Sequence, residues 1–237
     1  MINIEFALNE KFRKYLKLEY LFNQYDFFIK QKHNQYISNV IFSIIFKLNS
    51  NAARADVKVE LMNDLQRIEN KYKNHHEEAR ILKKRLEKIN SFSHYSLIGD
   101  KIMQELQLRA DAPIGINDID FPKYKIWNEL KDTRSKNIYF KNLTKDLLAI
   151  KESIYFILRI LRKPVKKEDL IATNMMAQIK INPLDRYELM TISVKSRVMY
   201  EASISANKYA ININFTHPDN ETKIKKIIKF TVFLNHL

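Results

Sequence analysis

The chain has 237 residues, enough for one large domain or two small ones, and its 46% apolar content is typical of a folded protein. Because it has only 2 glycines and no cysteine, the sequence excludes phosphate-binding glycine loops, dinucleotide-binding turns, disulfides, zinc sites with thiolate ligands and cysteine nucleophiles. The net charge of +14 favours an acidic partner, which is nucleic acid, anionic lipid or an acidic protein segment.

The first residues lack the apolar stretch of a signal peptide. The longest apolar run, residues 40–46, is far shorter than the roughly 20 residues that span a bilayer. The lack of cysteine also fits a reducing compartment. We therefore expect a cytoplasmic protein that does not insert into a membrane.

The first predicted helix runs from about residue 9 to 30. Asn9 is its expected N-cap, and Glu10 lies in the first turn, where the helix dipole favours an acid. Helical periodicity places apolar residues on one face and charged residues on the other. The apolar set is Leu8, Phe12, Tyr15 and Phe22, and the charged set is Glu10, Arg13, Lys14 and Lys17. Arg13 and Lys17, one turn apart, form a basic ridge that is either a solvated surface or a docking site for acids.

Glu19 is the exception on this helix, because it lies within the apolar arc, between Tyr15 and Phe22. A carboxylate in that position is expected to be partly buried and to pair with an internal cation or with backbone donors. It also argues against a helix that lies on a membrane, because an acid in the lipid-facing stripe is costly.

Further helical patterns follow in chain order. They span about 35–48, 56–72, 77–89, 96–108 and 134–163, with a break at 49–53 and a turn near 73–76. The first of these is apolar nearly all round, which predicts a central helix, although its β-branched residues leave a strand possible. Residues 109–122 contain one glycine and two prolines and are predicted to be a connector, and Pro164 ends the last helix.

After Pro164 the apolar period changes from 3.6 to 2, which predicts strands. The alternating stretches are 172–181, 187–194, 209–215 and 227–234. In the third, Tyr209, Ile211, Ile213 and Phe215 are expected to face one way. About four strands close in sequence predict an antiparallel sheet. The expected fold class is therefore α+β: a mainly helical domain over 1–164 with the connector 109–122, and a β domain over 165–237, packed together as one compact unit.

No arrangement of residues predicts catalysis. The six histidines are scattered, the pair His75 and His76 lacks the spacing of a zinc helix, and no serine lies in a nucleophile elbow. We therefore expect no catalytic, cofactor or metal site and no enzyme. On charge alone, the alternative is a nucleic-acid-binding protein, and a hydrolase with an unrecognised site is a third possibility.

Five segments in the same order resemble the ZapD family. They are LNEKFRKYLKLEYLF (8–22), DVKVEL with LQR (56–67), FPKYKIW (121–127), the stretch from ILR to Gln178 (160–178), and ISANKYAI (204–211). The resemblance covers nearly the whole chain. The chain departs from the family pattern at Met175, where the family has glycine, and at Met176, where it has an aromatic residue. It is also about two residues shorter near Lys208, and several arginines of the family are lysines here.

The resemblance implies a non-enzymatic cell division factor of the cytoplasm, with a helical part and a β part. Members of this family form dimers that bind the C-terminal tail of FtsZ through a basic surface and crosslink its filaments at the mid-cell division ring. Matched position by position, the residues implied to bind the tail are Arg13, Lys17, Lys101, Lys125 and Lys208. Glu19 and Trp127 are expected to have structural roles.

Overall fold

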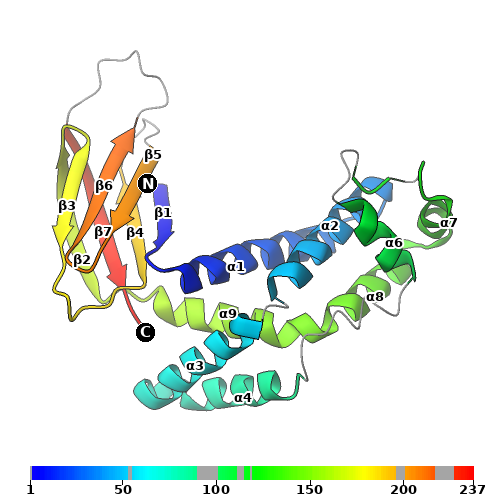
Figure 1. Cartoon of the computed structure of the whole chain (residues 1–237), viewed down its shortest axis with the longest axis horizontal. Coiled ribbons are helices and arrows are strands. Elements are labelled where there is room, and N and C mark those ends of the chain that lie inside the picture. Colours follow the sequence, from blue (N-terminus) through cyan, green and yellow to red (C-terminus); the bar gives the residue numbers. More distant parts are fainter. Residues whose placement is uncertain are drawn as a thin grey trace. The chain divides into compact units, whose positions relative to one another are not determined.

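The computed structural model describes residues 2–52, 55–89, 101–110, 115–117, 119–195, 201–216 and 227–237. Internal contacts divide the chain into two compact units. The helical unit is Lys14–Ile157, and the sheet unit combines Met1–Arg13 with Leu158–Leu237. The N-terminal residues therefore belong with the C-terminal strands (Figure 1).

Helices account for most of the described part of the helical unit (Figure 1). They are α1 Glu10–Phe28, α2 Gln35–Ala52, α3 Ala55–Lys71, α4 His76–Glu87, α6 Lys101–Ala110, α7 Pro122–Leu130, α8 Thr133–Thr144 and α9 Leu148–Leu161, with short 3-10 turns η1 Lys73–His75 and η2 Lys145–Leu147. The turn predicted near 73–76 is η1. It joins α3 to α4, and the ion pair from Lys83 Nζ to Glu69 Oε2, 2.8 Å long, links these two helices.

The apolar stretch 40–46 belongs to α2, so the predicted central helix is confirmed and the alternative strand is wrong. Four side chains of α2 are fully buried, at 0% exposure: Ile41, Phe42, Ile45 and Leu48. Their neighbours Ile44 and Phe46 are also buried. Complete burial of one such side chain stabilises a fold by about 1.5–3 kcal/mol. The core of the helical unit is therefore built around α2.

Two helical boundaries differ from the prediction. No break occurs at 49–52, because α2 continues to Ala52 and the side chains of Ser50 and Asn51 donate hydrogen bonds back to the Lys47 carbonyl. The pattern at 134–163 is not one helix, because η2 separates α8 from α9. There the Thr144 hydroxyl donates to the Phe140 carbonyl at 3.0 Å, a side-chain bond that competes with the helical ladder.

Two further predictions fall near gaps in the described residues. The helix predicted at 96–108 begins outside them, and α6 accounts for its described part. Within the predicted connector, residues 115–117 and 119–121 contain neither helix nor strand. Helix α7 was not predicted. It starts with Pro122 in its first turn, where proline is favoured because no backbone N–H is needed.

The sheet unit contains one antiparallel sheet of seven strands in the order β1-β4-β7-β2-β3-β6-β5. The strands are β1 Ile2–Ala7, β2 Lys166–Thr173, β3 Met176–Lys180, β4 Leu189–Val194, β5 Glu201–Ala206, β6 Ala210–Thr216 and β7 Ile227–Asn235. The prediction of a helical part and an antiparallel sheet is confirmed, but the predicted number of strands, about four, was too small.

The missing strands have physical explanations. β1 and β5 lie at the two edges of the sheet, where a strand needs no continuous apolar face, and β5 is built of small and polar residues. The stretch 172–181, predicted as one strand, holds the end of β2, a tight turn and β3. A turn without glycine or proline gave no signal in the sequence.

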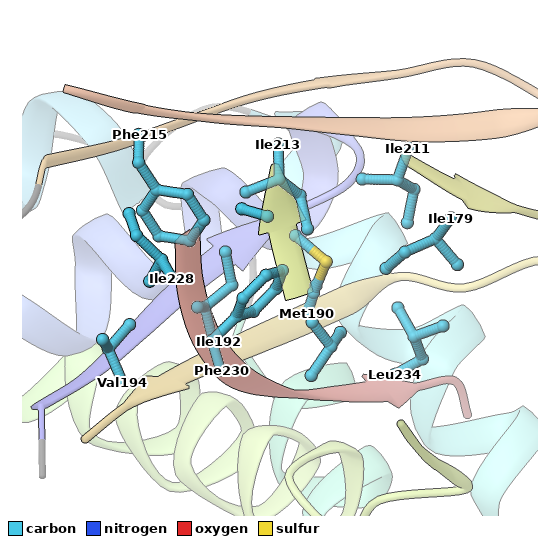
Figure 2. Close-up of a cluster of buried hydrophobic side chains, with 12 residues drawn as sticks. Ile179, Met190, Ile192, Val194, Ile211, Ile213, Phe215, Ile228, Phe230 and Leu234 are labelled. Carbon is cyan, nitrogen blue, oxygen red and sulfur yellow. The ribbon is translucent and has the colours of Figure 1, made fainter. Parts of the chain in front are cut away.

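The core of the sheet unit is formed by alternate residues of β4, β6 and β7, which point toward one another (Figure 2). The predicted inward positions Ile211, Ile213 and Phe215 are confirmed, whereas Tyr209 precedes β6 and is 58% exposed. The rings of Phe215 and Phe230 lie 5.1 Å apart, although β2 and β3 separate their strands in the sheet. Three strand spacings in a flat sheet cover about 14 Å, so this sheet is strongly curled.

The turn between β2 and β3 has an unusual residue for its backbone. Asn174 has φ 51° and Met175 has φ 67°, and Thr173 pairs directly with Met176. A two-residue hairpin turn with both φ values positive favours Asn-Gly, so Met175 carries a side chain where glycine is preferred. The position is the one at which the resemblance expects glycine.

We expect the Met175→Gly variant to be more stable than Met175→Ala by about 1 kcal/mol, because only alanine keeps the Cβ that disfavours this backbone conformation. Both substitutions lose the same packing of Met175 against the sheet core, so their difference isolates the backbone effect. The measurement is denaturant unfolding of both variants. At the neighbouring exposed strand position Met176 the order should reverse, and equal stabilities at position 175 would contradict the argument.

Candidate partner-binding surface

The start of α1 follows the prediction. The backbone N–H of Phe12 donates to Asn9 Oδ1 at 2.9 Å, so Asn9 caps the helix, and Glu10 lies in the first turn. Phe12 and Tyr15 are 0% exposed and Phe22 is 2% exposed, which confirms the predicted inner face at these three positions. These buried residues fix which side of α1 faces solvent. Leu8 was wrongly placed with them, because it precedes α1, is half-buried and packs against the core of the sheet unit.

Arg13 and Lys17, the basic ridge, both lie on the exposed side of α1. Arg13 pairs with Glu10 at 3.2 Å, and both side chains are more than half exposed. An exposed pair of this kind contributes only about 0.2–1 kcal/mol, so it leaves the guanidinium available to a partner. Lys17 makes no ion pair with any residue that the structure describes.

Lys14 does not belong to the outer charged set, which corrects the prediction. Its side chain is 21% exposed and pairs with Asp56 and Glu60 of α3, the latter at 3.3 Å. The hydrogen bond with Asp56 raises the pKa of Lys14, and the same bond lowers the pKa of Asp56. Lys14 therefore ties α1 to α3, and the charge open to a partner is that of the basic ridge.

The most buried acid in contact with α1 is Asp64 of α3, with a side chain 1% exposed. Its carboxylate accepts hydrogen bonds from the Tyr15 hydroxyl at 3.1 Å and from Arg67 at 3.2 Å. Glu19 is half-buried and lies close enough to Tyr155 for its charge to affect that residue. Burial, with the charges of Asp26 and Glu19, raises the pKa of Tyr155 to about 12. The ion pair expected for Glu19 stays a prediction.

The other three predicted residues are exposed and lie on different elements. Lys101 begins α6, Lys125 lies on α7, and Lys208 lies in the turn between β5 and β6 with its Nζ 4.8 Å from the Tyr209 ring. Within the helical unit, α6 and α7 lie at the opposite end from the start of α1 (Figure 1). The structure therefore does not gather Lys17, Lys101 and Lys125 into one patch on a single copy of the chain.

Trp127, 9% exposed, lies in an aromatic cluster that joins α2, α7 and α8. Its ring centroid is 5.6 Å from Phe42, 5.9 Å from Tyr124 and 5.2 Å from Tyr139. Such ring pairs contribute about 0.5–1.5 kcal/mol each beyond the area they bury. The contacts are those of a residue that holds three helices together.

His33 lies at the edge of this cluster, 9% exposed, with its ring 5.6 Å from that of Phe140. Burial lowers the pKa of His33 from its ordinary value of 6.5, and the charge of Lys136 lowers it further. A neutral imidazole is therefore preferred in the folded protein. As the pH falls, His33 is protonated in the unfolded chain before it is protonated in the folded chain. The free energy of unfolding therefore decreases as the pH falls from the ordinary histidine pKa toward the lower pKa of the folded protein.

We expect the free energy of unfolding to decrease as the pH is lowered from about 7.5 to 5.5. In a His33→Gln variant the free energy of unfolding should decrease less over the same pH range. The measurement is denaturant unfolding at a series of pH values. His76→Gln, at an exposed position on α4, is the matched control and should keep the slope. Equal slopes for the wild type and His33→Gln would contradict a neutral, buried His33.

Two exposed aromatic residues of α1 were missed by the sequence analysis. Tyr20 is 63% and Phe27 is 60% exposed, and their spacing from Arg13 and Lys17 continues the outer side of the helix. The signal was present in the sequence, because Arg13, Lys17, Tyr20 and Phe27 follow one another at steps of four, three and seven residues, which keep to one face of a helix. The exposed side of α1 is basic at its start and aromatic toward its end.

Among the residues that the structure describes, no three His, Cys, Asp or Glu side chains are grouped so as to hold a metal ion. None of the described helices is both long enough and apolar enough to span a membrane.

Comparisons with known proteins agree on one family. A sequence model described as "ZapD: Cell division protein" matches residues 16–214. A relative from Janthinobacterium sp. (strain Marseille), named "Cell division protein ZapD", is 27% identical over 240 residues, which cover 95% of this chain and 94% of the relative. The similarity extends over both units of the chain.

Proposed function

Because the chain belongs to the ZapD family of cell division proteins, we propose that it binds the C-terminal tail of FtsZ through a basic surface and, as a dimer, crosslinks FtsZ filaments into bundles at the division ring. The observation that carries the proposal is the basic ridge on α1. Arg13 is fixed in the helix by a capped first turn and a buried inner face, yet its side chain is 57% exposed. Such a ridge is suited to an acidic, extended segment.

Lys101, Lys125 and Lys208 are proposed as further contacts with the tail. All three are exposed, and a dimer can bring together residues that are distant on one copy. Four of the five proposed contacts are lysines, which supply charge but not the fork of two donors that arginine offers to a carboxylate. Each single contact should therefore be weak and sensitive to salt.

Weak contacts suffice for bundling if they are repeated. A homodimer presents two equivalent sites, and a filament presents many tails, so the second binding event is intramolecular. This effect raises net binding by roughly 10²–10⁴ over that of a single site. Monomeric chains at all working concentrations in analytical ultracentrifugation would contradict this mechanism.

The deciding experiment is co-sedimentation of the protein with filaments of full-length FtsZ and of FtsZ that lacks its C-terminal tail. We expect bundles and bound protein only with the full-length filaments, and binding that weakens as salt is raised. Equal binding to both filaments would contradict the proposal. Tight binding to duplex DNA, with a salt slope of about one unit for each phosphate contact, would instead indicate the nucleic-acid alternative. In cells, a fluorescent fusion is expected at mid-cell in the cytoplasm.

A further inference from the structure

A cleft of about 400 Å³ opens within the helical unit, between the start of α2 and the segment that joins α7 to α8. Lys125, Lys131 and Lys136 line it together with His33, and Glu129 and Asp132 are the acids on its wall. Of these residues, only Lys125 was a candidate from the sequence. The cleft adjoins the aromatic cluster of Trp127, whose ring centroid is 5.6 Å from Lys136 Nζ.

Lys136 is the most unusual residue of the cleft, because a lysine is almost never fully buried without a partner. It is 3% exposed, and its Nζ donates to the Asn128 carbonyl at 2.7 Å. No carboxylate that the structure describes pairs with it. Burial lowers the pKa of Lys136. A buried ammonium with two donors left over is a ready partner for an anion.

The cleft also contains polar groups that lack partners. His33 is nine-tenths buried, and among the described residues its Nδ1 has no hydrogen-bond partner. Within the same residues, neither the oxygen nor the nitrogen of the Asn128 side-chain amide has one. Buried polar atoms are normally hydrogen-bonded, so several unpaired atoms around one cleft are a departure from the rule. Asn128 Nδ2 is the donor among them, whereas Asn128 Oδ1 is an acceptor. Nδ1 of a neutral His33 is also an acceptor, because its Nε2 donates to the Ile29 carbonyl at 3.4 Å. An acceptor-only ligand such as a carboxylate can therefore bond with Asn128 Nδ2 and with Lys136 Nζ.

Two helix N-termini add partial positive charge, because α2 begins at Gln35 and α8 begins at Thr133, and both residues line the cleft. Each terminus already has one capping bond. Asn34 Oδ1 accepts from the N–H of Ile37, and Asp132 Oδ1 accepts from the N–H of Ser135 at 2.7 Å. The remaining first-turn N–H groups and the dipoles favour an anion in the same space as Lys136.

The charge balance favours a singly charged ligand. Three lysines face two carboxylates, so the formal excess is 3 − 2 = 1 positive charge, and His33 is preferentially neutral. We propose that this cleft is a binding site for one carboxylate group, with Lys136 as its buried anchor and Lys125 and Lys131 at its entrance. The carboxylate belongs either to an acidic side chain or terminus of a protein segment or to a free organic anion.

This site does not depend on FtsZ as the partner. Lys125 is shared with the proposed tail-binding surface, but Lys136 and Asn128 are not part of it. A free anion could accept hydrogen bonds from Lys136 Nζ and Asn128 Nδ2 just as an acidic side chain could. Failure of the filament experiment would therefore leave this site standing. The two proposals are tested on different molecules.

Trp127 is the only tryptophan of the chain, so its fluorescence reports directly on the cleft. The full-length protein is titrated at constant ionic strength with a capped oligoglutamate peptide, with acetate, and with the capped oligoglutamine peptide of equal length. We expect a saturable change with carboxylates and none with oligoglutamine. Tighter binding of the peptide indicates a protein segment, equal or tighter binding of acetate indicates a free anion, and no response to either carboxylate overturns the proposal.

Lys136→Met keeps the length and apolar packing of the side chain but removes its charge. It should weaken carboxylate binding at least roughly tenfold, the effect of losing a charged hydrogen bond. Its melting temperature should not fall, because no buried carboxylate loses a partner. Lys141→Met, on the exposed side of the same helix, should bind as the wild type does. Equal weakening in both variants, or a Lys136→Met protein that does not fold, would overturn the assignment.

Discussion

Replacement of Asp64 by alanine is expected to lower the free energy of unfolding by about 3 kcal/mol. The Asp64 side chain is 1% exposed and joins α3 to α1 through its bond with the Tyr15 hydroxyl. Tyr15 is 0% exposed, so its hydroxyl is left buried without this acceptor. Arg67 also loses its bond with this carboxylate, and a small void remains where the carboxylate was. All of these losses occur where α3 packs against α1.

Denaturant unfolding measures the loss, and a double-mutant cycle with Tyr15→Phe identifies its source. If the hydroxyl–carboxylate bond carries much of the effect, the two substitutions together should cost clearly less than the sum of their separate costs. Asp146→Ala removes an exposed acid from the same unit and should change stability by no more than about 0.5 kcal/mol. A loss for Asp64→Ala as small as that of the control would show that the carboxylate is dispensable.

Asp64 and Glu19 also show the limit of reading one helix at a time. Periodicity gave the inner face of α1 correctly and drew attention to Glu19, because that acid interrupts an apolar arc. Asp64 gave no such signal, since its burial depends on Tyr15, which lies 49 residues away in the sequence. A helical period predicts which side of a helix is inside, but it does not predict which helix packs there.

The same distinction applies to charges. The basic ridge was placed on the exposed side of α1 by spacing alone, and Arg13 is indeed exposed. Lys14 was placed with it, but its flexible stem allows it to turn toward Asp56 and Glu60 of α3. The orientation of a side chain at the boundary between two helix faces depends on which partner it meets. A local pattern does not predict partners that lie far away in the sequence.

In the sheet unit, the strands predicted correctly are those with a buried face. β6 and β7 alternate apolar and polar residues over most of their length, whereas the edge strand β5 has no large apolar side chain except Ile204. Curling of the sheet could not be predicted either, because it follows from contacts between β6 and β7 across its inner face. Fold class follows from periodicity, whereas strand number and closure depend on tertiary contacts.

Charge reversal of the basic ridge, Arg13→Glu with Lys17→Glu, is expected to abolish FtsZ bundling. Two cations become two anions, so attraction for an acidic tail is replaced by repulsion. If each site loses tenfold in affinity, about 1.4 kcal/mol, a crosslink that needs two sites weakens about a hundredfold. Stability should change by no more than about 0.5 kcal/mol, because both side chains are exposed. The new acid beside Glu10 adds only a few tenths of a kcal/mol.

Light scattering of polymerising FtsZ measures bundling, and a thermal melt of each variant measures folding. The matched control is Lys84→Glu with Lys88→Glu, which makes the same change of charge at two exposed lysines, also one turn apart, at the end of α4. We expect the control to bundle filaments nearly as well as the wild type. Equal loss in both double variants would mean that net charge alone governs bundling, and a large fall in the melting temperature of the ridge variant would mean that Arg13 and Lys17 support the fold. Loss of bundling confined to the ridge variant, with its melt unchanged, would locate the contact with FtsZ on the exposed side of α1.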